Sequence, residues 1–589
     1  MQTPKQFYQT QVSVFQEQLA ILKKQLLQLS ILRFLVFLLV IGSIVFVIKG
    51  ITYFGIAAFI FLSVFVFLIL KHQSLQKDKK HTEAKLDLNK TELKVLDKDF
   101  KHLDAGTAFL NPKHFFSHDI DLFGIGSFFQ YINRTATSEG KQLLADTLTS
   151  NNTKNINNKQ EALAELAQKT TWRQDFYATA KTVENNKAVR TILTSIENYE
   201  SVLPSHLKIT STIFSVISLA IIGLVGFGVL SFSVLTLWFF VGLTFTGAFF
   251  KKTNNLYEQA GKSKSVFNQY HQLIEQVETE TFSSTLLKEK QEATQTNNQK
   301  ASKILKEFSK ILDAFDQRNN VLIAVVGNAL FLWEIKNALK TENWIATHKN
   351  TVQHWFEVVS FFDAQNTLAN FVFNHPNYVF PKITEHNFVI DGKQLGHPLL
   401  KEAKRIDNDF NINKEEFFIV TGANMAGKST FLRTVSLSIM MANCGLPVCA
   451  AEFNYAPTKL ITSMRTSDSL SEDESYFYSE LKRLKFIVDE IKNENYFIIL
   501  DEILKGTNST DKAEGSKKFV EKLTKSKSTG IIATHDVSLC ELANDYNEVK
   551  NYFFDAYISD NELTFDYLLK QGVCKNRNAS FLLQKMEIV

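Results

Sequence analysis

The chain has 589 residues, too many for one compact core, so we expect two to four domains. Its net charge of +4 is small for this length, and so it neither requires nor excludes a nucleic-acid partner. The 4 cysteines form no C-x-x-C pair, which argues against a zinc site or a disulfide framework, and we expect buried, reduced thiols.

The first predicted elements are two hydrophobic spans near the N-terminus. Phe34–Ile48 contain no charged side chain, Lys49 and Gly50 interrupt the run, and Ile51–Leu70 are again uncharged. The second run has 20 residues, the length that a helix needs to cross the hydrocarbon core of a bilayer. The pattern therefore predicts a transmembrane hairpin over residues 34–70.

The flanking segments, residues 1–33 and 71–117, show helical periodicity. Apolar residues recur at alternating steps of three and four in Val12–Leu29 and, with Asn89 included, in Leu86–Leu103. This is the spacing of the buried positions of a coiled coil. We expect two cytoplasmic helices that extend the hairpin and pair antiparallel. Ordinary amphipathic helices packed on another domain are the alternative.

A second hairpin is predicted over residues 209–250. Ile209–Phe250 is a run of 42 residues without a charged side chain, enough for two spans with a bend near Gly228–Ser231. Lysines flank both hairpins on their outer sides, and only Lys49 lies in a connecting turn. The positive-inside rule then predicts an integral membrane protein whose termini and large domains are cytoplasmic. Soluble core helices are the alternative for any one segment, but four such runs in two pairs disfavour it.

The stretch "VTGANMAGKSTFLR", Val420–Arg433, has the spacing of a phosphate-binding loop. A predicted strand, Glu415–Val420, precedes it and a helical pattern follows. Backbone N–H groups and the helix N-terminus then face the phosphates of ATP. We predict that Lys428 reaches the β- and γ-phosphates and assists catalysis, and that the Ser429 hydroxyl ligates Mg²⁺. The residues predicted to bind ATP in this loop are Gly422, Asn424, Met425, Gly427, Lys428, Ser429 and Thr430.

Two later apolar runs carry the remaining candidate catalytic residues. "YFIIL" (Tyr496–Leu500) predicts a buried strand that ends at Asp501 and Glu502. We assign Asp501 to the Mg²⁺ shell and Glu502 to the general base that polarises the attacking water. "GIIATHD" (Gly530–Asp536) predicts a third strand that ends at His535, which would sense the γ-phosphate or orient the water. Together these segments predict an α/β P-loop NTPase domain with a mostly parallel sheet.

These motifs resemble those of the MutS mismatch-repair ATPases. The Asn424–Met425 pair inside the loop is distinctive of that family, and "LDEILKGTNSTD" (Leu500–Asp511) is similar to its Walker B segment and the loop that follows. "LGHPLL" (Leu395–Leu400), "MANCGLPVCAAE" and "LTFDYLLKQGVCKNRNASFLL" resemble other parts of the same domain. The resemblance implies a MutS-type (ABC/MutS) ATPase domain over residues 384–589.

A weaker resemblance extends upstream. Asp121–Leu148 and Phe361–Ile383 are similar to the start and the end of the MutS core, or lever, domain. It implies an all-α lever in residues 118–208 and 251–383, with the second hairpin between the two parts; residues 253–345 also have helical composition. We find no segment like the mismatch-reading domain and no Phe-x-Glu wedge motif, and so expect a variant that lacks this domain.

The resemblance also implies a homodimer through the ATPase domains. In the family each nucleotide lies between two subunits, and a serine of the partner reaches the γ-phosphate. Ser475 occupies the matching position. Asp473 and Glu474 precede it where the family tends to have a small or basic pair, which adds negative charge near the phosphates.

Three functional hypotheses follow. The first is a membrane-anchored MutS-family ATPase that hydrolyses ATP with Mg²⁺ and, as a clamp-like dimer related to mismatch repair, binds DNA. The alternative is an ATP-driven mechanical or scaffold protein that opens and closes its membrane-linked arms, does not bind DNA, and responds to lipid or to an unknown protein partner. In the third, the chain binds ATP as a switch for dimerisation and hydrolyses almost none of it. The presence of four of the predicted catalytic and metal-binding side chains, Lys428, Asp501, Glu502 and His535, argues against this hypothesis.

Overall fold

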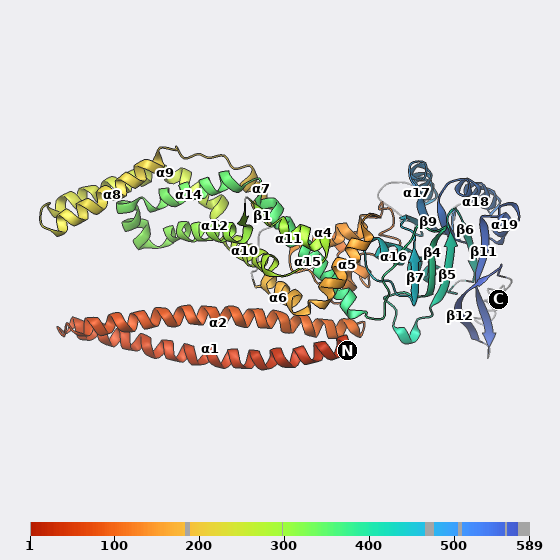
Figure 1. Cartoon of the computed structure of the whole chain (residues 1–589), viewed down its shortest axis with the longest axis horizontal. Helices are drawn as coiled ribbons and strands as arrows, with labels where there is room; N and C mark the ends of the chain where they lie inside the picture. The colour runs from red at the N-terminus through yellow and green to blue at the C-terminus, as the bar shows by residue number, and fades with distance from the viewer. Residues whose placement is uncertain are drawn as a thin grey trace.

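The chain is elongated, with an α/β region at one end and the tips of two helical hairpins at the other (Figure 1). A largely helical region connects the two ends. The computed structural model describes residues 2–182, 189–296, 298–423, 425–465, 476–504, 509–559 and 562–574.

The first hairpin consists of two long continuous helices, α1 (Pro4–Ile48) and α2 (Phe54–Leu96). They pack against each other antiparallel, and their apolar outer halves form the tip (Figure 1). A capping box at Thr3 starts α1, because the Thr3 hydroxyl accepts from the Gln6 backbone N–H and the Gln6 side chain accepts from the Thr3 N–H. The expected antiparallel pairing is confirmed. α2 also packs on α6 (Thr170–Lys181) of the helical region, so the alternative interpretation applies to part of this helix as well.

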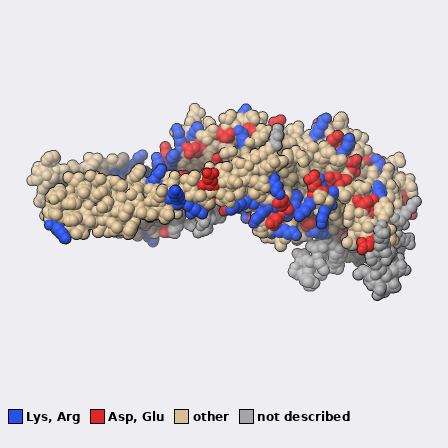
Figure 2. All heavy atoms as spheres, turned by 90° about the horizontal axis from the view of Figure 1, so that it is seen from below, with Lys and Arg blue, Asp and Glu red and all other residues tan. Residues whose placement is uncertain are grey.

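The second hairpin consists of α8 (Leu207–Gly226) and α9 (Phe232–Ala260), with the bend at the predicted place. Among the described residues, these two helices, α1 and α2 are the four that are long and apolar enough to cross a membrane. Both hairpin tips point to the same end of the molecule (Figure 1). Figure 2 shows that this end is almost free of charged side chains, whereas Lys and Arg appear where the apolar surface ends.

The helical region is built around α15 (Val352–Asn374), which is buried along most of its length. Stacked aromatic pairs such as Phe308–Trp344 and Tyr270–Phe356 fill the core around it. The helical expectation for residues 253–345 holds for most of the segment. It fails at residues 280–284 and at the two-stranded hairpin of β1 (Gln295–Thr296) and β2 (Gln299–Lys300), and Leu332, with a φ of +49°, interrupts the helix. The other elements are α3 Phe128–Ile132, α4 Ser138–Thr149, α5 Ile156–Gln168, α7 Val189–Glu197, α10 Lys264–Thr279, α11 Thr285–Glu292, β1 Gln295–Thr296, β2 Gln299–Lys300, α12 Ala301–Asp316, the π-helix Ile323–Gly327, α13 Asn328–Phe331 and α14 Trp333–His348.

The C-terminal region is an α/β unit with two sheets. The larger sheet has the strand order β12-β11-β6-β10-β9-β8 and is parallel except for the antiparallel pair β11–β12. The smaller sheet has the order β3-β7-β4-β5. The bounds are β3 Lys382–Ile383, β4 Phe388–Leu395, β5 Asn408–Asn413, β6 Phe417–Gly422, α16 Lys428–Asn443, β7 Glu452–Tyr455, β8 Lys459–Ser463, α17 Tyr476–Glu490, β9 Tyr496–Asp501, α18 Ser509–Thr524, β10 Thr529–Ala533, α19 Leu542–Asp545, β11 Val549–Ser559 and β12 Glu562–Gln571.

Three details differ from expectation. The phosphate-loop strand begins at Phe417 rather than Glu415, because Glu415 has a φ of +65° and belongs to the preceding turn. The strand β10 ends at Ala533, and His535 therefore lies two residues beyond it. Cys574 is only half-buried, whereas the other three cysteines are buried as expected.

Candidate active site

The candidate nucleotide loop lies between β6 and α16, at the carboxyl end of the fully buried strand β6. Glycine is required at two points of this loop. Gly422 has a φ of +146°, and a Cβ there would lie 2.6 Å from the Phe554 carbonyl oxygen. Gly427 has a φ of +104°, and a Cβ there would lie 3.0 Å from the ring of Tyr567. Left-handed backbone and close neighbours together exclude larger residues at both positions.

Lys428 is the first residue of α16, and its side chain turns back into the loop. Its Nζ donates hydrogen bonds to the carbonyl oxygens of Gly422 at 2.7 Å and Ala423 at 3.1 Å. Burial lowers the pKa of Lys428, while the nearby Asp501 and Glu502 oppose that shift. The ammonium is thus held at the loop by groups of the chain itself, which is the position a phosphate-binding lysine requires.

The structure brings together the two residues predicted to hold magnesium. The Ser429 hydroxyl, in the first turn of α16, donates a hydrogen bond of 2.8 Å to the Asp501 carboxylate at the end of β9. Both groups are hard oxygen donors, which suit Mg²⁺. The described residues contain no group of three or more His, Cys, Asp or Glu that could hold a metal alone. Mg²⁺ at this place would thus depend on Ser429, Asp501, water and phosphate oxygens.

Glu502 and His535 face each other beside this pair. His535 Nε2 lies 2.8 Å from Glu502 Oε1 and 3.5 Å from Lys428 Nζ. Glu502 has a φ of +52°, and its backbone N–H donates to the Ala533 carbonyl, which fixes the direction of its side chain. The three predicted catalytic side chains therefore converge at the ends of β6, β9 and β10.

The other predicted loop residues are distributed as follows. Met425 has a φ of +68° and an exposed side chain, and Thr430 lies in the first turn of α16, also exposed. Asn424 and Ser475 lie outside the described residues.

A cavity of about 170 Å³ adjoins Gly427 and Thr430. Its wall includes His397, Phe431 and Tyr567, from three elements far apart in sequence. Burial lowers the pKa of His397 to about 4, so its imidazole is neutral at pH 7. Flat, uncharged rings next to a phosphate loop suit a nucleobase. Sequence reasoning assigned no role to these residues, although "LGHPLL" contains His397.

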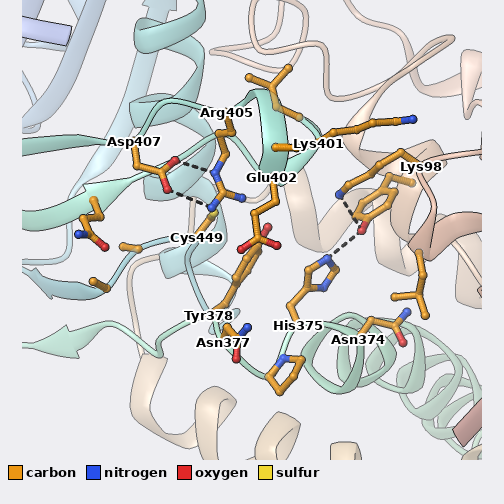
Figure 3. A pocket seen from close by; sticks show the side chains of 18 of the residues that line it. Lys98, Asn374, His375, Asn377, Tyr378, Lys401, Glu402, Arg405, Asp407 and Cys449 are labelled. Carbon is orange, nitrogen blue, oxygen red and sulfur yellow. Dashed lines mark hydrogen bonds and ion pairs between the residues drawn. The ribbon is translucent and has the colours of Figure 1, made fainter. Parts of the chain in front are cut away.

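A larger polar cleft of about 850 Å³ is lined by other residues of the 395–407 segment, among them Lys401, Glu402 and Arg405 (Figure 3). Inside it Tyr131 donates a hydrogen bond of 2.8 Å to His375 Nε2, because His375 Nδ1 donates to the Phe371 carbonyl. Lys98 Nζ donates to the Tyr131 hydroxyl at 3.0 Å. Arg405 is paired with Asp407 on the opposite wall (Figure 3).

Lys98 also links this cleft to the cavity beside Gly427, which we call the candidate nucleotide cavity. Its Nζ donates a hydrogen bond of 2.6 Å to the Pro398 carbonyl, next to His397. Leu400 of the same loop lines both the cleft and the cavity. Lys98 lies two residues after the end of α2, so the end of the first hairpin is hydrogen-bonded to the loop that lines this cavity.

Comparison with known proteins shows what the C-terminal region of the chain is similar to. Residues 418–586 match the sequence profile of the family described as MutS domain V. The chain is 31% identical over 234 residues to DNA mismatch repair protein MSH4 of Arabidopsis thaliana (38% of this chain, 28% of that protein). It is 32% identical over 206 residues to DNA mismatch repair protein MutS of Aquifex pyrophilus (34% and 24%). It is 29% identical over 213 residues to human MutS protein homolog 4 (34% and 22%).

The chain thus spans about a quarter of the length of the curated relatives that it matches. Within that span the similarity is to an ATPase domain. The C-terminal α/β region is accordingly a MutS-type domain V, an enzyme domain that hydrolyses ATP, and a largely helical region precedes it.

Proposed function

We propose that the chain is a membrane-anchored, Mg²⁺-dependent ATPase whose nucleotide state is transmitted to its helical arms. In this proposal Lys428 binds the phosphates, Ser429 and Asp501 hold the metal, Glu502 is the general base and His535 orients the water. Both hairpins cross the membrane, and both termini and domain V are cytoplasmic.

One observation carries the proposal: a single helix leads from a predicted span to the candidate nucleotide cavity. α2 runs from Phe54 to Leu96, and Lys98 then donates a hydrogen bond to the carbonyl of Pro398, which lies between His397 and Leu400 of the cavity wall. The end of this arm is held firmly. The Glu92 carboxylate is buried, pairs with Arg134 and accepts from the Asn374 side chain of α15. A rearrangement of the cavity wall on nucleotide binding would therefore shift the arm as a rigid body.

The start of α1 supports the same coupling. Tyr8 is buried, and its hydroxyl donates to Asn374 at 2.7 Å and contacts Asn370 of α15 at 3.2 Å. Lys5 pairs with Asp97 at the end of α2. Both helices of the hairpin are thus tied to the C-terminal end of α15, where the chain enters domain V.

The test is to reconstitute the full chain in liposomes and to measure ATP turnover and the distance between α2 and domain V with paired spin labels. We expect turnover to require Mg²⁺, and the distance to differ between the ATP-bound and nucleotide-free states. An unchanged distance with normal turnover would contradict the transmission to the arm.

DNA is the second candidate ligand, and the names of the relatives favour it, since several are DNA mismatch repair proteins. In this version two copies pair through domain V, Ser475 of each copy reaches the other's γ-phosphate, and the dimer encloses DNA. The surface in Figure 2 gives no independent support, because acidic and basic side chains are interspersed over the region beyond the apolar end.

The two candidates differ in a direct measurement. Detergent-purified chain is assayed for ATP turnover with duplex, mismatched, branched and no DNA, and for DNA binding at several salt concentrations. A DNA clamp requires binding that weakens steeply with salt. If turnover responds to lipid or to a protein partner and no DNA binding is found at low salt, the DNA clamp is ruled out and the mechanical function is the candidate that remains.

A further inference from the structure

A third apolar segment lies between Arg318 and Glu334, in addition to the two hairpins. The 15 residues Asn319–Trp333, "NNVLIAVVGNALFLW", contain no charged side chain. This is shorter than the ~20 residues that a helix needs to span a bilayer. The segment forms a π-helix (Ile323–Gly327) and α13, and then breaks at Leu332.

The two ends of this segment meet. Arg318 and Glu334, the charged residues that flank it, form an ion pair at 3.3 Å, and both side chains are almost fully buried. The hydroxyl of Thr253 on α9 donates to the same Glu334 carboxylate. Both ends of the segment therefore lie beside the same turn of α9, at Thr253. This turn follows Lys251 and Lys252, directly after the uncharged part of α9.

The middle of the segment packs deep into the second hairpin. A Cβ on Gly242 of α9 would lie 1.9 Å from the Ala329 carbonyl oxygen, so the two backbones are in direct contact. At 1.5 Å per helical residue, Gly242 is about 12 Å along α9 from Phe250, the last residue of the uncharged run. The hydrocarbon core of a bilayer is about 30 Å thick, so Ala329 would lie near its middle.

The irregular backbone at this depth is shielded by protein. Leu332, where the helix breaks, has an exposed fraction of 0%. The Phe331 carbonyl accepts a hydrogen bond from Ser215 of α8 at 3.3 Å. Non-helical backbone is tolerated inside a membrane only where protein groups satisfy and cover it, and both conditions hold here.

The outer face of the segment is apolar and exposed. Val321, Leu322, Val325 and Val326 have exposed fractions of 76%, 72%, 40% and 42%. Their spacing places them on one side of the helix. α13 of this segment contacts both α8 and α9, whose outer sides also carry exposed apolar residues. An exposed apolar surface of this kind needs a covering partner.

We propose that residues 319–333 form a re-entrant membrane segment whose outer face contacts lipid acyl chains. The inference rests on the proposed membrane topology of the second hairpin. It adds a fifth membrane-embedded element, tied to the helical region through Arg318 and Glu334, so that α12 and α14 are both anchored at the membrane surface.

The test uses single cysteine substitutions in the full chain, reconstituted in liposomes and treated with a water-soluble maleimide. Peptide mass spectrometry separates the introduced cysteine from the native ones. Val326→Cys reports on the segment, Phe240→Cys on the middle of the uncharged part of α9, and Glu307→Cys on an exposed position of α12. We expect Val326→Cys and Phe240→Cys to react at least tenfold more slowly than Glu307→Cys, and all three to react equally after denaturation.

A fluorophore at position 326 distinguishes lipid from protein as the covering partner. We expect lipids with a nitroxide in the middle of the acyl chain to quench it as strongly as a fluorophore at position 240. Fast labelling of Val326→Cys with protection of Phe240→Cys would overturn the re-entrant segment and leave the anchoring intact. Fast labelling of both would overturn the membrane topology itself. If position 326 is protected from the maleimide but its fluorophore is not quenched by the nitroxide lipids, the outer face contacts a protein, such as a second copy of the chain. This result would also overturn the proposed contact with lipid.

Discussion

The imidazole of His535 lies 2.8 Å from the carboxylate of Glu502, and the same Nε2 atom lies 3.5 Å from the ammonium of Lys428. The proposed base is therefore oriented by a histidine from the neighbouring strand end. A carboxylate held in this way can accept a proton from water without first changing its rotamer.

Replacing Glu502 by Gln removes the proposed base and keeps the shape of the side chain. We expect turnover to fall at least 100-fold, in the range that general-base catalysis contributes, while ATP binding is retained and an ATP-bound dimer accumulates. Phosphate release, equilibrium nucleotide binding and light scattering measure the three effects. Lys428→Ala is the contrasting variant, because it should lose binding. Hydrolysis by Glu502→Gln at the parental rate would disprove the assignment of the base.

Replacing Asp501 by Asn tests the magnesium site. The amide keeps the hydrogen bond to Ser429 but removes one negative charge, and affinity for hard cations depends on ligand charge. We expect the Mg²⁺ concentration that gives half-maximal turnover to rise about tenfold or more, and binding of ATP in EDTA to stay the same. Titration of Mg²⁺ at saturating ATP gives the answer. An unchanged midpoint would place the metal elsewhere.

Replacing Lys98 by Met tests the link between the arm and the candidate nucleotide cavity. The variant loses the bond to Pro398, and a hydrogen bond from a charged donor is worth about 1.5–3 kcal/mol. We expect a lower unfolding midpoint and ATP binding weakened by about fivefold, since the loop around His397 is released. Lys401→Met is the control, because Lys401 lines the same cleft but is exposed. Equal nucleotide affinity in the two variants would argue against the link.

The sequence alone was sufficient for features that depend on local pattern. The glycine loop, Lys428 and Ser429 lie within one short segment, and the alternating three-and-four spacing along α1 marks the seam that packs on α2. Asp501 and Glu502 were identifiable because a buried strand places the residues that follow it at the carboxyl edge of the sheet.

Features that depend on distant parts of the chain were not predicted. His397 and Tyr567 line one cavity only because β12 lies beside β5. The side chain of Asn408, at the start of β5, donates a hydrogen bond to the Tyr567 carbonyl of β12. The segment 319–333 was missed because its length is below that of a span, and the signal that identifies it is tertiary. Its two flanking charges pair with each other, which no periodicity reveals.

His375 gives a prediction on pH and stability. Burial lowers its pKa in the folded chain to about 3, whereas an unfolded histidine has a pKa of about 6.5. Between these values the unfolded chain binds more protons, so stability is highest above pH 6.5 and falls as the pH is lowered. At pH 5 the protonation of His375 in the unfolded chain lowers the free energy of unfolding by about 2 kcal/mol relative to neutral pH.

We therefore expect His375→Gln to reduce the loss of stability between pH 7 and pH 5. Gln keeps an acceptor for the Tyr131 hydroxyl and has no proton to gain. Urea unfolding of the solubilised full chain, followed by near-UV circular dichroism, compares the variant with the parent at both pH values. His386→Gln, at an exposed position, is the matched control and should behave as the parent. His397 keeps its own share of the pH dependence, so His375→Gln should still lose stability between pH 7 and pH 5, but less than the parent. An identical loss in both chains would show that His375 accepts a proton in the folded state.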